Sequence, residues 1–156
     1  MVIIKRISDN NQELNFIRDL FQEYSNELNE NLCFQSFDEE LKNPLKKYGG
    51  SYGSLLLAFW NNEPAGCIAL QPLNKEGVCE MKRLYVRPQY RKFGIGEELV
   101  KMLLTEAKEK GYKKMVLDTL ERLQAAIRLY EKYGFKNTSA YYINPLPNVV
   151  YMEKFL

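Results

Sequence analysis

The sequence predicts an α/β fold in which one mixed, largely antiparallel sheet of about seven strands carries about four helices on its two faces. Hairpin patterns in the first half of the chain and strand–helix–strand crossovers in the second half lead to this prediction. The composition agrees, because 156 residues that are 46% hydrophobic and 27% charged can bury a core without disulfides. We therefore expect one domain over residues 1–156.

The first half of the chain supplies a strand, two helices and a hairpin. Residues 2–7 are predicted as a strand rather than a signal peptide, and Asp9 or Asn10 is expected to cap the first helix. Its apolar stripe consists of Leu14, Ile17, Leu20, Phe21, Tyr24 and Leu28. A second helix at 37–48 is interrupted near Pro44. Strands at 54–60 and 65–70 then flank a turn at 61–64.

The second half alternates strands with helices. A strand at 79–86 leads through a glycine-containing loop into a helix that runs to residue 110 and stops at Gly111. A further strand, expected within 114–120, precedes a second helix that closes before residue 135. Strands at 135–143 and 149–155, joined by a proline-containing loop, complete the chain.

The loop between the strand at 79–86 and the following helix has the composition of an anion site. It consists of Arg91, Lys92, Phe93, Gly94, Ile95 and Gly96. Free backbone N–H groups and the positive end of a helix dipole collect there, glycines permit close approach, and the two basic side chains add charge. A diphosphate is the expected ligand. The alternative is a tight turn with solvated charges, because the loop lacks a third glycine and no nucleotide P-loop exists.

Two motifs together resemble the GNAT superfamily of acyl-CoA-dependent N-acetyltransferases. Arg-x-x-Gly-x-Gly at 91–96 is followed about thirty residues later by Leu-Tyr-Glu-Lys-x-Gly-Phe at 129–135. The resemblance implies that residues 91–96 bind the pyrophosphate of coenzyme A. It also implies that two central strands splay apart around the pantetheine arm, with the backbone of Leu84, Tyr85 and Val86 pairing with that arm.

The resemblance further implies two catalytic residues. Tyr130 holds the position of a family tyrosine that protonates the leaving thiolate; otherwise it packs under the sheet as one of eleven tyrosines. Glu80 holds the position of a glutamate that some members use as general base. The alternative for Glu80 is an ion pair with Lys82 or Arg83, or a group that orients the ammonium of the substrate. An asparagine common in the family is replaced here by Leu123, so Gln124 is the available substitute.

Composition narrows the chemistry and the compartment. The chain has no histidine, which excludes a Ser-His-Asp or Cys-His mechanism and most catalytic zinc sites, and we expect no metal. Three cysteines at spacings unlike a zinc motif favour buried thiols and a reducing cytoplasm. No apolar stretch is long enough to span a membrane. A net charge of +2 makes nucleic acid a poor candidate.

The leading hypothesis is therefore transfer of an acetyl group from acetyl-CoA to a primary amine by direct attack, with a backbone N–H near Leu84 polarising the thioester. Acidic residues within 19–41 either suggest a cationic acceptor or are the solvated faces of two helices. A small-molecule acceptor is favoured over a protein. The acceptor site is expected to be walled by Phe34, Phe37, Tyr141, Tyr142 and the loop at 145–147; the alternative is ordinary packing of these residues against the sheet. A homodimer remains open. The alternatives are a non-catalytic acyl-CoA binding or sensing module and a protein-interaction domain.

Overall fold

A computed structural model describes residues 1–156, with the exception of the Cys33 side chain. Seven strands form one sheet in the order β1-β2-β3-β4-β5-β7-β6. The strands are β1 (Val2–Arg6), β2 (Ser54–Trp60), β3 (Glu63–Pro72), β4 (Val78–Val86), β5 (Lys114–Leu120), β6 (Lys136–Asn137) and β7 (Val149–Phe155). The β4–β5 pair is parallel, and the other neighbouring pairs are antiparallel.

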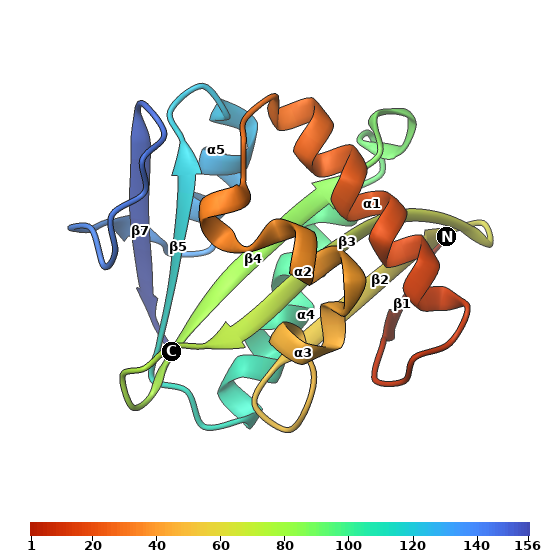
Figure 1. Ribbon diagram of the computed structural model, residues 1–156, viewed down its shortest axis with the longest axis horizontal. Coiled ribbons are helices and arrows are strands. Elements are labelled where there is room, and N and C mark those ends of the chain that lie inside the picture. Colours follow the sequence, from red (N-terminus) through yellow and green to blue (C-terminus); the bar gives the residue numbers. More distant parts are fainter.

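Helices cover both faces of this sheet (Figure 1). They are α1 (Glu13–Leu28), α2 (Phe37–Lys42), α3 (Pro44–Tyr48), α4 (Ile95–Glu109) and α5 (Gln124–Lys132). Helices α1, α2 and α3 lie on one face, and α4 and α5 lie on the other. The predicted fold class is confirmed, with a fifth helix because Pro44 divides the segment expected as one interrupted helix.

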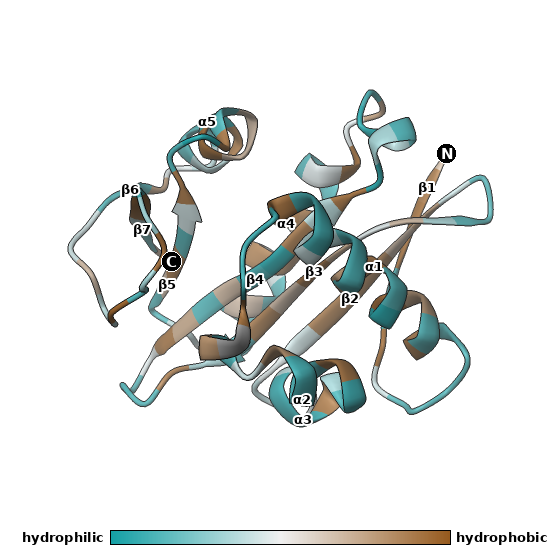
Figure 2. Ribbon diagram, turned by 45° about the horizontal axis from the view of Figure 1, so that its top comes forward, coloured by the Kyte–Doolittle hydropathy of each residue, from teal (hydrophilic) through white to brown (hydrophobic). Residues whose placement is uncertain are grey.

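Apolar side chains fill both layers between helices and sheet. Figure 2 shows hydrophobic residues along the central strands and hydrophilic residues on the outer surfaces of the helices. Phe21 of α1 and Tyr48 of α3 are fully buried in one layer, and Leu99 and Leu103 of α4 are fully buried in the other. Burial of these apolar side chains holds the sheet between two layers of helices.

The two central strands pair over only part of their length. Residues Val78, Cys79 and Glu80 of β4 align with Lys114, Met115 and Val116 of β5. Beyond them the strands diverge toward the end where α1 finishes and α5 begins (Figure 1). The splay that the family resemblance implies is therefore present. It leaves backbone groups of the second half of β4 without a strand neighbour on the β5 side.

A β-bulge lies in β4 beside this opening. The register with β3 shifts between Cys67 and Ala69, and Arg83 has a left-handed backbone with φ of 61°. Successive strand residues normally face opposite sides, yet Lys82 and Arg83 both face the layer of α1 and α2. Lys82 points to Asp118, and Arg83 points to Glu40 of α2. The bulge thus brings two cations to one side of the sheet.

Two sequence predictions need correction. The first helix begins after Gln12, and its cap carries no side-chain bond; neither Asp9 nor Asn10 caps it. The strand predicted at 135–143 is reduced to Lys136–Asn137. The physical reason is that Tyr141 and Tyr142, although adjacent, both bond to carboxylates on the same face of the sheet. A strand would direct them to opposite faces.

Candidate active site

Three connected cavities run through the opening of the sheet. The loop cavity, of about 550 Å³, is lined by residues that include Leu84, Tyr85, Val86, Arg91, Gly94 and Gly96. The central cavity, of about 70 Å³, includes Tyr24, Lys82, Leu84, Asp118, Thr119 and Tyr130. The lysine cavity, of about 550 Å³, includes Lys47, Lys75, Glu80, Lys82, Lys114 and Tyr141.

Shared residues join these cavities in series. Leu84 and Tyr24 line both the loop cavity and the central cavity. Gln35 and Lys82 line both the central cavity and the lysine cavity. The two larger cavities have the volumes of small-molecule sites, and the central cavity is the narrow passage between them. This arrangement suits two ligands that meet at one point.

The loop after β4 presents an anion-binding surface to the loop cavity. Gly94 has φ of 72° and precedes the first residue of α4, so the N–H groups of the first helical turn face outward without helical partners. Arg91 lines this cavity and donates from Nη2 to Glu27 at 2.6 Å and from Nε to the Val86 carbonyl at 2.8 Å. Glu27 and the Val86 carbonyl thus hold the Arg91 guanidinium beside the loop cavity.

Not every predicted loop residue faces this cavity. Gly94, Ile95 and Gly96 line it, whereas Lys92 and Phe93 do not. The Phe93 ring instead stacks on Trp60 of β2, with the ring centroids 4.2 Å apart and the planes 6° from parallel. Phe93 therefore secures the loop against the sheet edge. Arg122, which the sequence reasoning did not select, also lines the cavity.

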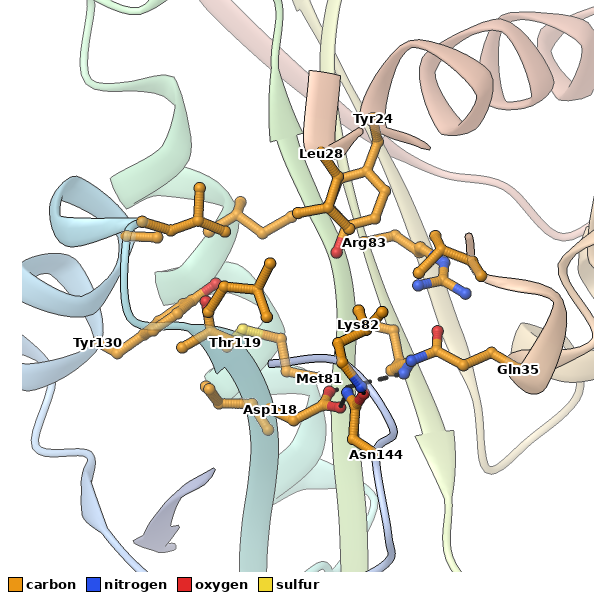
Figure 3. A pocket seen from close by; sticks show the side chains of 17 residues that line it. Tyr24, Leu28, Gln35, Met81, Lys82, Arg83, Asp118, Thr119, Tyr130 and Asn144 are labelled. Atoms are coloured by element: carbon orange, nitrogen blue, oxygen red, sulfur yellow. Dashed lines mark hydrogen bonds and ion pairs between the residues drawn. The ribbon is translucent and has the colours of Figure 1, made fainter. Parts of the chain in front are cut away.

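Tyr130 extends from α5 into the central cavity (Figure 3). Tyr24 reaches the same cavity from α1, on another side. Burial raises the pKa of Tyr130, and the charges of Tyr24 and Asp118 add to this effect. Burial also raises the pKa of Tyr24. Both phenols therefore stay protonated near neutral pH and can donate hydrogen bonds.

Glu80 is buried beside the lysine cavity, and its oxygens already have partners. Gln71 donates to Oε1 at 2.6 Å, and the Tyr141 hydroxyl donates to Oε2. The Lys82 ammonium lies 3.9 Å from the same Oε2. The ion pair with Lys82 that the sequence offered as an alternative is therefore present. Burial raises the pKa of Tyr141, and the neighbouring Glu80 charge adds to this.

A second carboxylate, Asp118 of β5, was missed by sequence reasoning and forms part of the passage. It accepts from the Tyr142 hydroxyl. Figure 3 shows its contacts with Asn144, whose Nδ2 donates at 2.7 Å, and with Lys82, which lies 3.8 Å away. Lys82 thus sits between two carboxylates. Burial lowers its pKa, while Glu80 and Asp118 oppose that shift. The signal in sequence was weak, because an acidic residue inside a strand commonly faces solvent.

The bulge residue Arg83 is clamped by a buried ion pair. Its Nε and Nη2 donate to Glu40 at 2.7 and 3.0 Å, and both side chains are 1% exposed. The guanidinium also lies over the rings of Tyr24 and Phe37. Burial alone would raise the pKa of Glu40, but the hydrogen bonds and charge of Arg83 hold it below its ordinary value. Phe37, predicted to wall the acceptor site, is instead part of this core.

Three acidic residues of α1 and α2 are engaged by arginines. Glu23 pairs with Arg87 at 2.7 Å, and Glu27 with Arg91 at 2.6 Å. Glu40 pairs with Arg83. These carboxylates do not line the lysine cavity. The electrostatic reason for expecting a cationic acceptor is therefore absent from the site itself.

Comparisons with known proteins agree with this architecture. The model of the acetyltransferase (GNAT) family matches residues 14–135. An uncharacterised N-acetyltransferase of Schizosaccharomyces pombe is 49% identical over 143 residues, which cover 91% of this chain and 88% of the relative. The chain belongs to the GNAT family of acetyltransferases, and it is an acyltransferase. The predicted family and enzyme class are confirmed.

Solved structures show the same fold. An acetyltransferase from Streptococcus agalactiae superimposes with a TM-score of 0.82 at 23% identity, covering 99% of this chain and 98% of that one. The PaiA N-acetyltransferase of Thermoplasma acidophilum, solved in complex with coenzyme A, gives a TM-score of 0.75 at 19% identity, covering 100% and 99%. Among the residues that the structure describes, no helix has the length and apolar character needed to cross a bilayer.

Proposed function

We propose that this chain transfers an acetyl group from acetyl-CoA to a primary amine by direct attack on the thioester. The observation that carries the proposal is the series of three cavities through the splay of β4 and β5, with Tyr130 at the narrow point. The donor enters from the loop cavity and the acceptor from the lysine cavity. Both reacting groups then meet in the central cavity, which holds them in position.

The loop cavity fits the donor. Outward N–H groups at the start of α4 and the Arg91 guanidinium suit a diphosphate, and a Cβ built on Gly94 would meet nothing within 4 Å. The backbone from Leu84 to Val86 lacks a β5 partner, which supports pairing with the pantetheine amides. A backbone N–H near Leu84 would polarise the thioester carbonyl.

Tyr130 is proposed to assist the leaving sulfur. Attack forms the C–N bond of the amide and breaks the C–S bond, and the sulfur must then gain a proton. A phenol whose pKa is raised by burial is a weaker acid than a thiol near ~8.5, so complete transfer from Tyr130 is uphill. We therefore assign Tyr130 as the hydrogen-bond donor that stabilises the departing thiolate, which leaves as the anion and takes its proton from solvent water.

The amine proton is proposed to leave through Glu80 or water. Glu80 is near the passage, but its oxygens accept from Gln71 and Tyr141. Transfer of the amine proton to Glu80 through a bridging water therefore fits the geometry better than direct contact between the amine and Glu80. The acceptor is proposed to be a small molecule. We also propose a single-domain protein located in the cytoplasm, where the free thiols of Cys67 and Cys79 would persist.

Thermal unfolding with and without acetyl-CoA tests the donor site. Wild type should gain stability at millimolar acetyl-CoA, and Gly94→Glu with Arg91→Ala should nearly abolish the gain, because the glutamate sets bulk and negative charge against the diphosphate. Gly50→Glu is the matched control, since Gly50 also has a left-handed backbone, with φ of 74°, and open space around it. An unchanged melting temperature of wild type in acetyl-CoA would contradict the proposal.

A further inference from the structure

The lysine cavity has a charge pattern that the acetyltransferase reaction alone does not require. Its wall includes Lys47, Lys75, Lys82 and Lys114 against one carboxylate, Glu80. That carboxylate is buried and already accepts from Gln71 and Tyr141. A cationic ligand would therefore meet four ammonium groups and find no free carboxylate on the wall.

The lysines at the mouth of this cavity are available to a ligand. Lys75, in the turn between β3 and β4, is exposed and makes no ion pair with any residue that the structure describes. Lys114 lies 3.6 Å from Glu153, whose side chain is only partly buried and does not line the cavity. Both cations line the same cavity, and neither has a carboxylate partner on its wall.

The inner lysines leave further positive charge. Lys47 lies 3.1 Å from Glu40, but Glu40 is also bound by the two donors of Arg83. One carboxylate thus serves two cations. Lys82 stands where the lysine cavity meets the central cavity, between Glu80 and Asp118. The two carboxylates offset the charge of Lys82 at this point, so it is burial that favours the neutral, nucleophilic form of an amine there.

The rest of the cavity wall combines apolar and polar side chains. Phe34, Val78, Val116 and the rings of Tyr141 and Tyr142 line the cavity. The Oε1 atom of Gln35, which borders both the central and the lysine cavity, is buried and has no hydrogen-bond partner. This acceptor lies where the N–H of an amine would pass. A ligand with a small apolar body, an amine at one end and an anionic group at the other matches these features.

We infer that the acceptor is an amine that carries a carboxylate or phosphate, with its anionic group held by Lys75 and Lys114 and its amine directed past Lys82 and Gln35. This inference rests on the proposed acetyl transfer and names the substrate class of the same site. It replaces the cationic acceptor expected from the acidic residues within 19–41, since none of these residues lines the lysine cavity.

Matched amines test the inference. Acetyl transfer is measured for β-alanine against β-alaninamide, leucine against leucinamide, and phosphoethanolamine against ethanolamine, with spermidine and agmatine as cations. The anionic member of a pair should have the higher kcat/KM, by roughly tenfold for two nearby lysines in a partly solvated site. Carboxylate pairs and the phosphate pair separate the two anion types. Higher kcat/KM for the amides, ethanolamine or the polyamines overturns the inference.

Charge variants connect any preference to this cavity. Lys75→Glu should remove the preference for anions and improve agmatine, and Lys114→Gln should weaken it, while the Kd of acetyl-CoA stays unchanged. Lys113→Gln is the matched control, because Lys113 is exposed beside Lys114 but does not line the cavity. An unaltered preference in both variants overturns the assignment.

The same measurements separate the two proposals. Failure of acetyl-CoA to bind at all counts against the proposed function. If acetyl-CoA binds but no amine is acetylated, calorimetric titration of β-alanine and phosphoethanolamine into the protein with coenzyme A decides the inference. Binding that Lys75→Glu abolishes supports it, and no binding of either anion overturns it.

Discussion

Two phenols, Tyr130 from α5 and Tyr24 from α1, reach the same small cavity. Only Tyr130 belongs to the motif that carries the family resemblance. Tyr24 is also fixed by Arg83, whose guanidinium lies over its ring, and by an edge contact with Tyr85. The environment of Tyr24 thus indicates a packing role beside the bulge. The Tyr130 hydroxyl is instead free to bond to the acetyl-CoA thioester in the proposed reaction.

Replacing Tyr130 by phenylalanine should lower kcat by roughly 10²–10³-fold, the usual contribution of a hydrogen-bond donor positioned on a developing anion. The Kd of acetyl-CoA should change little, because the ring and its packing remain. Steady-state kinetics and a donor titration measure the two effects. Tyr24→Phe is the matched control and should retain most of the activity. Equal losses in both variants would argue against a special role for Tyr130.

The Glu40–Arg83 pair is the most deeply buried charge pair described here, and it holds the bulge. Glu40→Gln leaves the Arg83 guanidinium buried without its counter-charge, which typically costs about 3–5 kcal/mol. Chemical denaturation measures this loss. The double variant Glu40→Leu with Arg83→Met should recover a large part of it, because no buried charge is then left alone. A stability equal to that of wild type in Glu40→Gln would contradict the assignment.

This pair also sets a pH dependence. The folded-state pKa of Glu40 lies below its ordinary value of 4.5. Its contribution to stability is therefore complete above that value and is lost as the pH falls through the lowered pKa. The stability difference between wild type and Glu40→Gln should be constant near neutral pH and shrink in acid.

At the scale of elements, the loop before α4 separates two basic residues that look alike in sequence. Arg91 lines the loop cavity and Lys92 does not. Arg91→Ala should weaken acetyl-CoA binding by roughly tenfold, because it removes a cation and leaves Glu27 unpaired beside the diphosphate. Lys92→Ala is the control and should change the Kd little. Calorimetric titration distinguishes them, and a larger effect from Lys92 would reverse the assignment.

Regular elements were predictable because their periodicity is local. The strand at Ser54–Trp60, the final strand at Val149–Phe155 and the apolar stripe of α1 all agree with the sequence prediction. The bulge at Arg83 was not predictable, because it depends on Glu40, which is 43 residues away in the chain. The strand predicted after β6 was wrong for the same reason. The positions of Tyr141 and Tyr142 are set by hydrogen bonds to Glu80 and Asp118 rather than by the alternation of a strand.

Some residues of the candidate site were predictable from the sequence and others were not. The loop and Tyr130 were found because family motifs mark them. Lys82, Asp118 and Gln35 carry no motif, and only the splay of two strands and the approach of α1 bring them to one passage. The number of acidic residues within 19–41 was a misleading guide to the acceptor, since it does not record which carboxylates already form ion pairs within the protein.

For the molecule as a whole, the acidic first half and the basic second half are joined by ion pairs. Glu23–Arg87, Glu27–Arg91 and Glu40–Arg83 link α1 and α2 to β4 and the loop that follows it. The exposed Glu27–Arg91 pair contributes little to stability in water, typically about 0–1 kcal/mol. Its effect is on position: it holds the end of α1 beside the loop cavity through which the donor is proposed to enter.

The stack of Phe93 on Trp60 gives the molecule a built-in optical reporter. Trp60 is the only tryptophan in the chain, so its ultraviolet emission comes from a single place. That place touches the loop proposed to hold the donor phosphates, although it lies outside the cavity itself. A shift of the loop on ligand arrival alters the quenching of one indole without any attached dye. Rapid mixing could then time the approach of the donor separately from the chemistry, with Phe93→Leu as the variant in which the signal is lost.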